Sequence, residues 1–239
     1  MTTQLDPFAA AENLYTITVR GAMNPAIHHP AWYRLINAIS PEEMALAATA
    51  QVEAGVGKHV QIQAAQGFSS AQFSVFTAGS LRITCLPEIW SIATTEASKL
   101  ERITEMAGTV FAALPHTPIS GYTVSFAHHR HTSLPDVGGH LARQVRSLPV
   151  GIPHVDGTVE SAYIRYAASS PSRDLVIDLQ PSAKAKTMVF IAVNATHKLQ
   201  PAKELELFDL RPLLAEAVTK ARRDAEDLVA KMTATLSSS

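Results

Sequence analysis

The 239-residue chain has little that could cross-link it, because it holds a single cysteine, Cys85. One cysteine cannot form a disulfide within the chain, and it cannot supply the thiolates of a cysteine zinc site. Cys85 stands in the apolar run LRITCLP, which predicts a small side chain packed in a core. The scarcity of thiols is typical of a protein from a reducing compartment.

Long apolar runs are also missing. No stretch reaches about 18 consecutive apolar residues, the length that predicts a membrane-spanning helix. The opening segment MTTQLDPFAAAENL lacks a basic region followed by an apolar run, so it does not resemble a signal peptide. We therefore expect a soluble, cytoplasmic protein.

Charge is scarce as well: charged residues make up 17% of the chain, and the formal net charge is -1. Proteins that bind nucleic acid are usually strongly basic on one face, because contacts to phosphate dominate their affinity. The charge balance therefore argues against a nucleic-acid partner. Hydrophobic residues make up 46%, which is ample for the core of one large domain or two small ones.

Familiar catalytic motifs do not occur. The sequence contains no Gly-x-Ser-x-Gly elbow, no Gly-x-Gly-x-x-Gly run and no Walker loop, and GVGKH at 55–59 lacks the rest of a phosphate-binding loop. The carboxylate pairs Glu42/Glu43 and Glu204/Glu206 have no feature that would raise a pKa. The sequence predicts no catalytic residue and no cofactor.

Regular patterns of apolar residues predict many strands and a few helices. Strands are expected at 15–20, 59–64, 71–77, 81–87, 89–95, 121–127, 159–169, 173–180 and 186–194, with a short extra one at 204–208. Helices are expected from Ser40 to Gly55, from Thr95 to Pro115, at 138–148, and from Asp209 to Leu236.

This order of elements repeats itself. Both halves read strand, helix, several strands, helix, and YTITV at 15–19 is similar to YTVSF at 122–126. We predict an α+β fold made of two related halves, 1–117 and 118–239, that form one structural unit. The order resembles, in topology alone, the duplicated fold of the TATA-box-binding protein. That resemblance implies one curved antiparallel sheet with helices on one face, and it carries no functional residue.

The two faces of such a sheet should differ. The inward positions are apolar: Tyr15, Ile17, Val19, Val60, Ile62, Leu81, Ile83, Cys85, Tyr122, Val124, Phe126, Leu175, Ile177 and Leu179. The other face is mostly neutral: Thr16, Thr18, Arg20, Gln61, Gln63, Arg82, Thr84, Thr123, Ser125, Asp174 and Asp178. Arg20, Arg82 and Arg165 are the obvious cations on these strands, so this face suits a protein partner or water better than DNA.

The segment FAHHRHTSLP at 126–135 gathers three of the ten histidines. Along a strand His129 and His131 share a face, and Asp136 is close enough in sequence to join them as a metal ligand, with His140 as a fourth. His128 would instead continue the apolar side. A polar turn at the end of a strand is the interpretation we favour over a metal site.

A second pair, His28 and His29, follows the first strand of the first half. If the two opening strands lie antiparallel, the two histidine groups lie at opposite ends and cannot form one centre. The candidate partner-binding residues are His28, His29, Trp32, His129, Arg130 and His131.

The last helix carries a narrow apolar stripe on a charged background. The stripe consists of Leu214, Val218, Ala221, Ala225, Leu228 and Met232. It can pack across its own sheet, or the end beyond residue 225 can project and pair with another subunit.

The sequence thus favours a non-enzymatic protein that acts through protein–protein contacts, as a homo-oligomer or a component of a larger assembly. One alternative is a metal-dependent hydrolase centred on His129, His131 and Asp136. Another is a small-molecule or lipid binder with a cavity between sheet and helices.

Overall fold

The computed structural model of the protein describes residues 11–45, 50–54, 58–62, 68–146, 162–199 and 209–237. The strands of its main sheet are β1 (Asn13–Gly21), β4 (Phe68–Ser69), β5 (Ser74–Ala78), β6 (Leu81–Leu86), β7 (Ile89–Thr94), β8 (Ile119–His131), β9 (Ile164–Ser169), β10 (Arg173–Pro181) and β11 (Met188–Lys198). A separate hairpin pairs β2 (Ala50–Ala54) with β3 (Lys58–Ile62). The helical segments are η1 (Pro25–Ile27), α2 (Pro30–Leu35), α3 (Pro41–Ala45), η2 (Ala97–Lys99), α4 (Leu100–Ala112), α5 (Val137–Arg146) and α6 (Leu210–Ser237).

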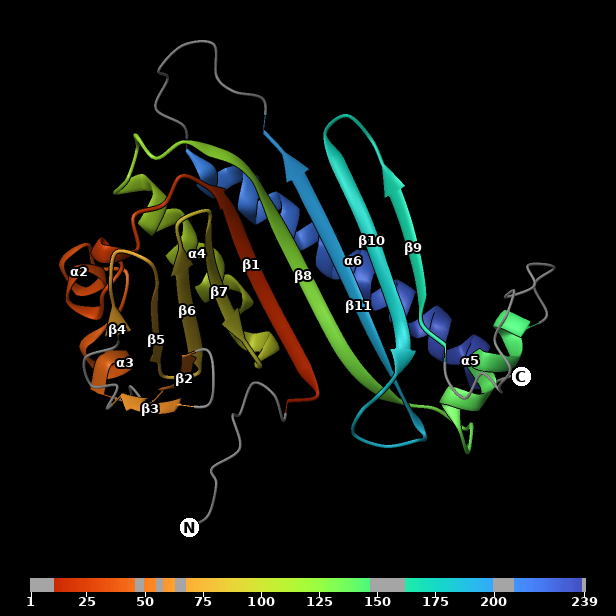
Figure 1. The fold of residues 1–239 in the computed structure, drawn as a ribbon. Coiled ribbons are helices and arrows are strands. Elements are labelled where there is room, and N and C mark those ends of the chain that lie inside the picture. The colour runs from red at the N-terminus through yellow and green to blue at the C-terminus, as the bar shows by residue number, and fades with distance from the viewer. Residues whose placement is uncertain are drawn as a thin grey trace, which may run out of the picture.

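The main sheet runs in the order β4-β5-β6-β7-β1-β8-β11-β10-β9, with antiparallel neighbours throughout (Figure 1). The protein is therefore α+β with one antiparallel sheet, as the sequence predicts. β1 and β8 lie side by side at its centre, and β7 and β11 flank them. From this centre the described strands continue outward to β4 at one edge and to β9 at the other.

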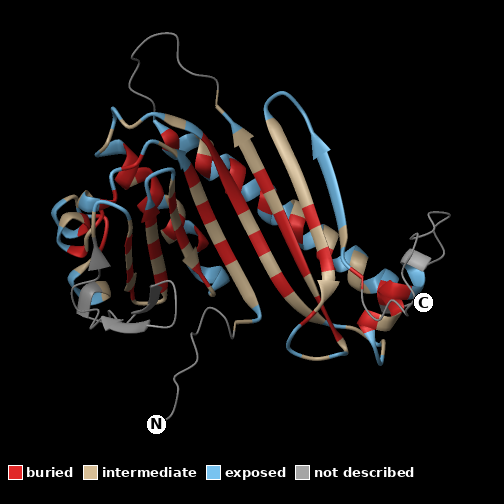
Figure 2. Cartoon of the chain, in the orientation of Figure 1, coloured by how far each residue is buried: buried red, intermediate tan, exposed pale blue. Residues whose placement is uncertain are grey.

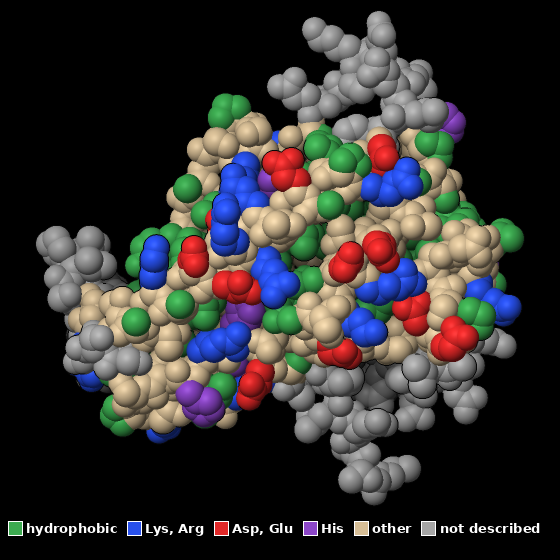
Figure 3. Space-filling view, turned by 180° about the vertical axis from the view of Figure 1, so that it is seen from behind, with side chains coloured by type: hydrophobic (Ala, Val, Ile, Leu, Met, Phe, Trp, Pro, Cys, Tyr) green, Lys and Arg blue, Asp and Glu red, His purple; other side chains and the backbone are tan. Residues whose placement is uncertain are grey.

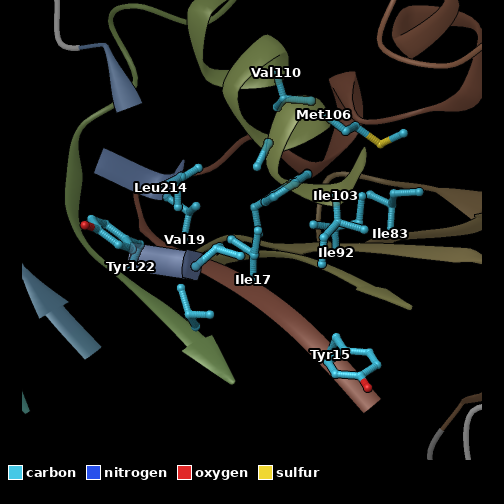
Figure 4. Close-up of a cluster of buried hydrophobic side chains, with 14 of the residues drawn as sticks. Tyr15, Ile17, Val19, Ile83, Ile92, Ile103, Met106, Val110, Tyr122 and Leu214 are labelled. Carbon is cyan, nitrogen blue, oxygen red and sulfur yellow. The ribbon is translucent and has the colours of Figure 1, made fainter. Parts of the chain in front are cut away.

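Helices α4 and α6 lie across one face of this sheet (Figure 1). The core fills the space between them and the strands, and Figure 4 shows its centre. Its members include Ile17, Val19, Ile83, Ile92, Ile103, Met106, Val110, Tyr122 and Leu214, all buried. Their burial is the main favourable term that holds the two helices on the sheet.

Alternation along the strands separates the two faces as predicted. In β1, Tyr15, Ile17 and Val19 are buried, whereas Thr16 and Thr18 are half-buried on the other face. The same stripes recur along the neighbouring strands in Figure 2. Because side chains alternate with a period of two, the pattern fixes which face receives the helices.

Helix α4 agrees closely with its prediction. The expected apolar positions Leu100, Ile103, Ala107, Val110 and Phe111 are all buried. The helix ends at Ala112, a few residues before Pro115. Its spacing of three and four residues keeps these side chains on the face toward the sheet.

Helix α6 packs along its own molecule for its whole described length. Ala225 belongs to the main core, and Val229 and Leu236 belong to a second cluster with residues of α5, β10 and β11. The interpretation in which the end beyond residue 225 projects is therefore wrong. The apolar stripe continues onto the second half of the sheet and ends against α5.

The region after α3 differs from its prediction. The helix begins as expected, with a capping box in which Glu43 N donates to Ser40 Oγ (3.1 Å) and Ser40 N donates to Glu43 Oε2 (2.8 Å). However, residues 50–54 form β2 rather than helix, and β3 pairs with β2 instead of joining the main sheet. Pairing between strands here overrides local helix propensity. The strand predicted at 204–208 lies outside the described residues.

Candidate functional site

The two histidine groups lie at opposite ends of the central strand pair, as predicted. Asn13, at the start of β1, pairs with His128, whereas Gly21, at its end, pairs with Ile119. His28 and His29 follow the end of β1, whereas the second group lies beside its start. They cannot share a ligand.

The second group belongs to a strand, which corrects the prediction of a polar turn. β8 continues to His131, and its last residues pair with β11, with His131 opposite Met188. The sequence pattern predicts that the strand ends at residue 127, because the polar side chains that follow do not indicate the backbone pairing that continues there. The ladder is satisfied on both sides, since His129 N also donates to Glu12 O at 2.8 Å.

His128 lies on the helix-covered face and is buried. Its Nδ1 is 2.9 Å from Asn13 Oδ1 and 3.0 Å from Arg130 Nη2, and Arg130 Nη1 donates to the same Asn13 oxygen at 2.8 Å. Burial, with the nearby Arg130 charge, lowers the pKa of His128 to about 4. The imidazole is therefore neutral at pH 7, and the cluster ties the start of β1 to the end of β8.

His129 and His131 lie on the opposite face of the sheet. His129 Nδ1 is 2.7 Å from Ser182 Oγ, and its ring lies against Phe190 with centroids 4.9 Å apart. His131 and Asp136 are exposed. Among the described residues, no group of three or more His, Cys, Asp or Glu side chains is placed to hold a metal ion. The geometry therefore gives no support to a hydrolase centred on His129, His131 and Asp136.

The first group contains a buried polar chain that the sequence did not reveal. Trp90 Nε1 donates to Tyr33 Oη at 2.6 Å, and Tyr33 Oη is 2.9 Å from His28 Nδ1. All three side chains are 1% exposed or less. Ser74 Oγ also donates to the backbone carbonyl of His28. His28 therefore offers no surface to a partner in this conformation.

Sequence reasoning missed Tyr33 and Trp90 because they are 57 residues apart. The one available signal was the alternation of β7, which places Trp90 on the inward face.

His29 and Trp32 have local structural roles. His29 precedes α2, and its Nδ1 accepts a hydrogen bond from Trp32 N at 3.3 Å, which caps the helix. Trp32 is half-buried and packs against the main core. Whether either residue also contacts a partner stays a prediction.

A pocket lies beside His28, where β1 ends and β8 begins. It has a volume of about 330 Å³, and its walls come from residues 22–24, Ile27, His28 and residues 113–118. Most of the lining is apolar. His28 is one of the lining residues, but its Nε2 is buried and has no hydrogen-bond partner among the described residues.

At the far edge of the sheet, β9 is exposed along most of its length (Figure 2). Tyr163 is 47% exposed and Tyr166 is 52% exposed. Arg165 pairs with Asp178 of β10 at 2.7 Å and lies over the Tyr163 ring, 5.4 Å from its centroid. Tyr163 Oη donates to the same carboxylate. This edge was not among the sites expected from sequence.

Charge on the helix-covered side is mixed. Figure 3 shows Lys and Arg interspersed with Asp and Glu over that face, without a continuous basic stripe on the surface it displays. Neighbouring opposite charges include Arg222 with Glu226 (2.8 Å) and Arg173 with Asp224 (3.3 Å). Such a surface does not favour the phosphate backbone of a nucleic acid.

No protein-family model and no curated protein matches the chain. In the described part of the chain, no helix is both long and apolar enough to span a membrane. The functional argument therefore stands on the geometry of β9.

Proposed function

We propose that the protein is a non-enzymatic assembly component that forms a homo-oligomer by pairing β9 of one copy with β9 of another. The observation that carries this proposal is the exposed strand at the edge of the sheet. An edge strand presents unpaired N–H and C=O groups, which can template a further strand.

The direction of these groups follows from the hairpin that joins β9 to β10. Ser170 N donates to Arg173 O at 2.8 Å, which marks a hydrogen-bonded pair. In an antiparallel ladder such pairs alternate with non-bonded ones. Arg165, Ala167 and Ser169 therefore turn their backbone N–H and C=O groups toward the outer edge. Among the described residues, none of these groups bonds to another segment.

The edge is compatible with a copy of itself. In an antiparallel pair centred on Ala167, Arg165 of one copy faces Ser169 of the other, so that two arginines do not meet. The charges nearest the edge are already neutralised within each copy, by Arg165 with Asp178 and by Lys198 with Asp174, each at 2.7 Å. Like-charge repulsion, which natural edge strands use to prevent pairing, is therefore weak here.

The finer features of the fold prediction belong to the same proposal. We infer that the halves 1–117 and 118–239 arose by duplication, with a topology like that of the TATA-box-binding protein. The support is the matching strand order on both sides of β1 and β8. We also propose a cytoplasmic location. The support is that the chain has one cysteine, Cys85, whose thiol is buried.

The decisive experiment uses proline to remove an outward N–H group. We expect the wild-type chain to form a dimer by native mass spectrometry and light scattering. Ala167→Pro should give a folded monomer, because the lost N–H does not belong to the ladder with β10. Ala167→Val keeps the N–H group and should remain dimeric.

Two results would contradict the proposal. One is a wild-type chain that stays monomeric at every concentration tested. The other is an Ala167→Pro variant that dimerises as well as the wild type does. Circular dichroism of each variant shows whether the sheet is intact.

A further inference from the structure

The side of β9 that faces the helices is exposed as well as its outer edge (Figure 2). Tyr166 lies opposite Ile177 in the ladder with β10, so both side chains are on the helix-covered face of the sheet. Ile177 is buried there, whereas Tyr166 is 52% exposed. Ala168 follows two residues later on the same face and is also exposed. β9 therefore presents a large aromatic ring and a small side chain next to each other at the edge of the sheet.

These side chains differ from those that protect natural edge strands. Such strands avoid pairing through charged side chains, prolines or bulges. On its helix-covered face β9 instead carries Ile164, Tyr166 and Ala168, and Ile164 packs against the second core cluster. Tyrosine is enriched in protein interfaces, because it supplies a large contact area at a low cost in side-chain entropy. This face of β9 therefore suits a partner strand.

The antiparallel pair centred on Ala167 uses the whole length of the edge. Arg165 of one copy then bonds with Ser169 of the other, and Ala167 bonds with its own counterpart, so every outward backbone group of β9 joins the ladder. A pair centred on residue 166 leaves Ser169 opposite a residue outside β9, and a pair centred on residue 168 does the same to Arg165. The backbone therefore favours the register centred on Ala167, because it makes the most hydrogen bonds.

In this register Tyr166 of one copy lies directly opposite Ala168 of the other. The two residues form a non-hydrogen-bonded pair, in which the side chains approach most closely. The ring then lies across the small methyl group and reaches toward Leu175, which is the ladder partner of Ala168 and is half-buried. Two-fold symmetry makes the same contact a second time, as in any interface between identical surfaces.

We propose that Tyr166 and Ala168 set the register of the β9 pair, with each Tyr166 ring seated on Ala168 of a second copy of this chain. This inference rests on the β9 pairing proposed above. The partner is a second copy because β9 itself supplies the small residue at the position that the ring requires. A pair centred on Tyr166 would instead place the two rings opposite each other and lose this fit.

Exchanging the two side chains tests the fit. Tyr166→Ala should raise the Kd of the dimer roughly tenfold or more, because each copy loses its ring. The double variant Tyr166→Ala/Ala168→Tyr should recover most of that loss, since the introduced ring again lies opposite an alanine in the register centred on Ala167. Tyr166→Phe keeps the ring and should dimerise as the wild type does. Leu86→Ala removes an apolar side chain that is 42% exposed on β6, and it is the control for non-specific association.

Analytical ultracentrifugation gives the Kd of each chain, and circular dichroism shows whether the sheet is intact. A Tyr166→Ala dimer as tight as the wild type would overturn the inference, and so would a double variant as weak as Tyr166→Ala. If either result is found while Ala167→Pro is monomeric, the β9 pairing stands and the register assignment alone fails. A monomeric wild-type chain would remove both.

Discussion

His28 and His128 have the same unusual property although they lie at opposite ends of the central strands. Each imidazole is buried, at 1% and 5% exposure, and each has its pKa lowered from 6.5 to about 4. Desolvation is the main cause in both cases, because burial penalises the charged ring. Both rings therefore act as neutral hydrogen-bonding groups within the fold.

These two histidines should make the protein sensitive to mild acid. In the unfolded chain each ring takes up a proton near its ordinary pKa of 6.5, whereas the folded chain resists protonation down to about 4. Their contribution to the free energy of unfolding is thus fully present above pH 6.5 and falls as the pH is lowered toward 4. Urea unfolding across this range measures the slope.

His28→Gln tests the share of one ring, since an amide can replace both imidazole nitrogens without titrating. The slope of the free energy of unfolding against pH, between pH 6.5 and 4, should become shallower. The decrease should correspond to about one proton fewer taken up on unfolding. The same substitution at the exposed His131 controls for the exchange of a histidine for glutamine outside the core. An unchanged slope in His28→Gln would mean that this ring is protonated in the folded chain.

At the scale of elements, α4 and α6 lie against each other at Gly108. A Cβ atom placed there would lie 2.2 Å from Arg211 Cγ and 3.2 Å from Arg211 Cβ. The glycine thus allows the start of α6 to lie against α4, although glycine lowers helix propensity by about 1 kcal/mol relative to alanine. Close packing of the two helices outweighs that local cost.

Gly108→Ala should therefore destabilise the protein by about 1–3 kcal/mol, despite its better helix propensity. In an Arg211→Ala background the same change should be neutral or stabilising by up to about 1 kcal/mol, because the crowding is relieved. Chemical denaturation of the wild type, the two single variants and the double variant gives the coupling free energy between Gly108 and Arg211. Additive effects would show that the two side chains do not meet.

How far the sequence predicts these elements depends on what each one needs. The strand faces and α4 can be predicted from the spacing of apolar residues along the sequence. Ile17 in β1 and Ile103 in α4 are examples, and both are buried. The length of β8 cannot be predicted in this way. Its histidines have the polar pattern of a turn, and only their pairing with β11 makes them part of the strand. The hairpin of β2 and β3 likewise depends on pairing between strands, which outweighs the helical character of its residues.

The candidate sites were harder to predict than the fold. The buried hydrogen bonds of His28 require Tyr33 of α2 to contact Trp90 of β7, and no local sequence pattern predicts that contact. The β9 edge needs the complete strand order, because a strand at the edge and one at the centre can have the same alternation. Sequence reasoning did place His128 on the apolar face, since it follows Phe126 by two residues.

At the scale of the whole molecule, α6 links the two parts of the core. Its first turns pack with α4 and the central strands, and its last turns pack with α5 and the strands near β9. Leu236, at 6% exposure, is the last buried side chain of this helix in the described residues. The end of α6 is thus part of the fold and is not a free arm.

Leu236→Asp should consequently cost about 2–4 kcal/mol, since it places an unpaired carboxylate in the second core cluster. Ala234→Asp, on the exposed side of the same turn, should change stability by no more than about 0.5 kcal/mol. Thermal and urea unfolding measure both. Equal, small effects would mean that the end of α6 does not dock.

The central pairing of β1 with β8 also sets an order of events during synthesis. Asn13 and His128 are 115 residues apart, so β1 leaves the ribosome long before the strand that covers one of its edges. Until β8 is made, the Ile17 and Val19 region has an open edge in a partly folded chain, and joining such distant strands slows folding. A nascent chain that stalls before residue 119 would expose the middle of the future sheet, so we expect the interval between β1 and β8 to be when this protein most needs a chaperone.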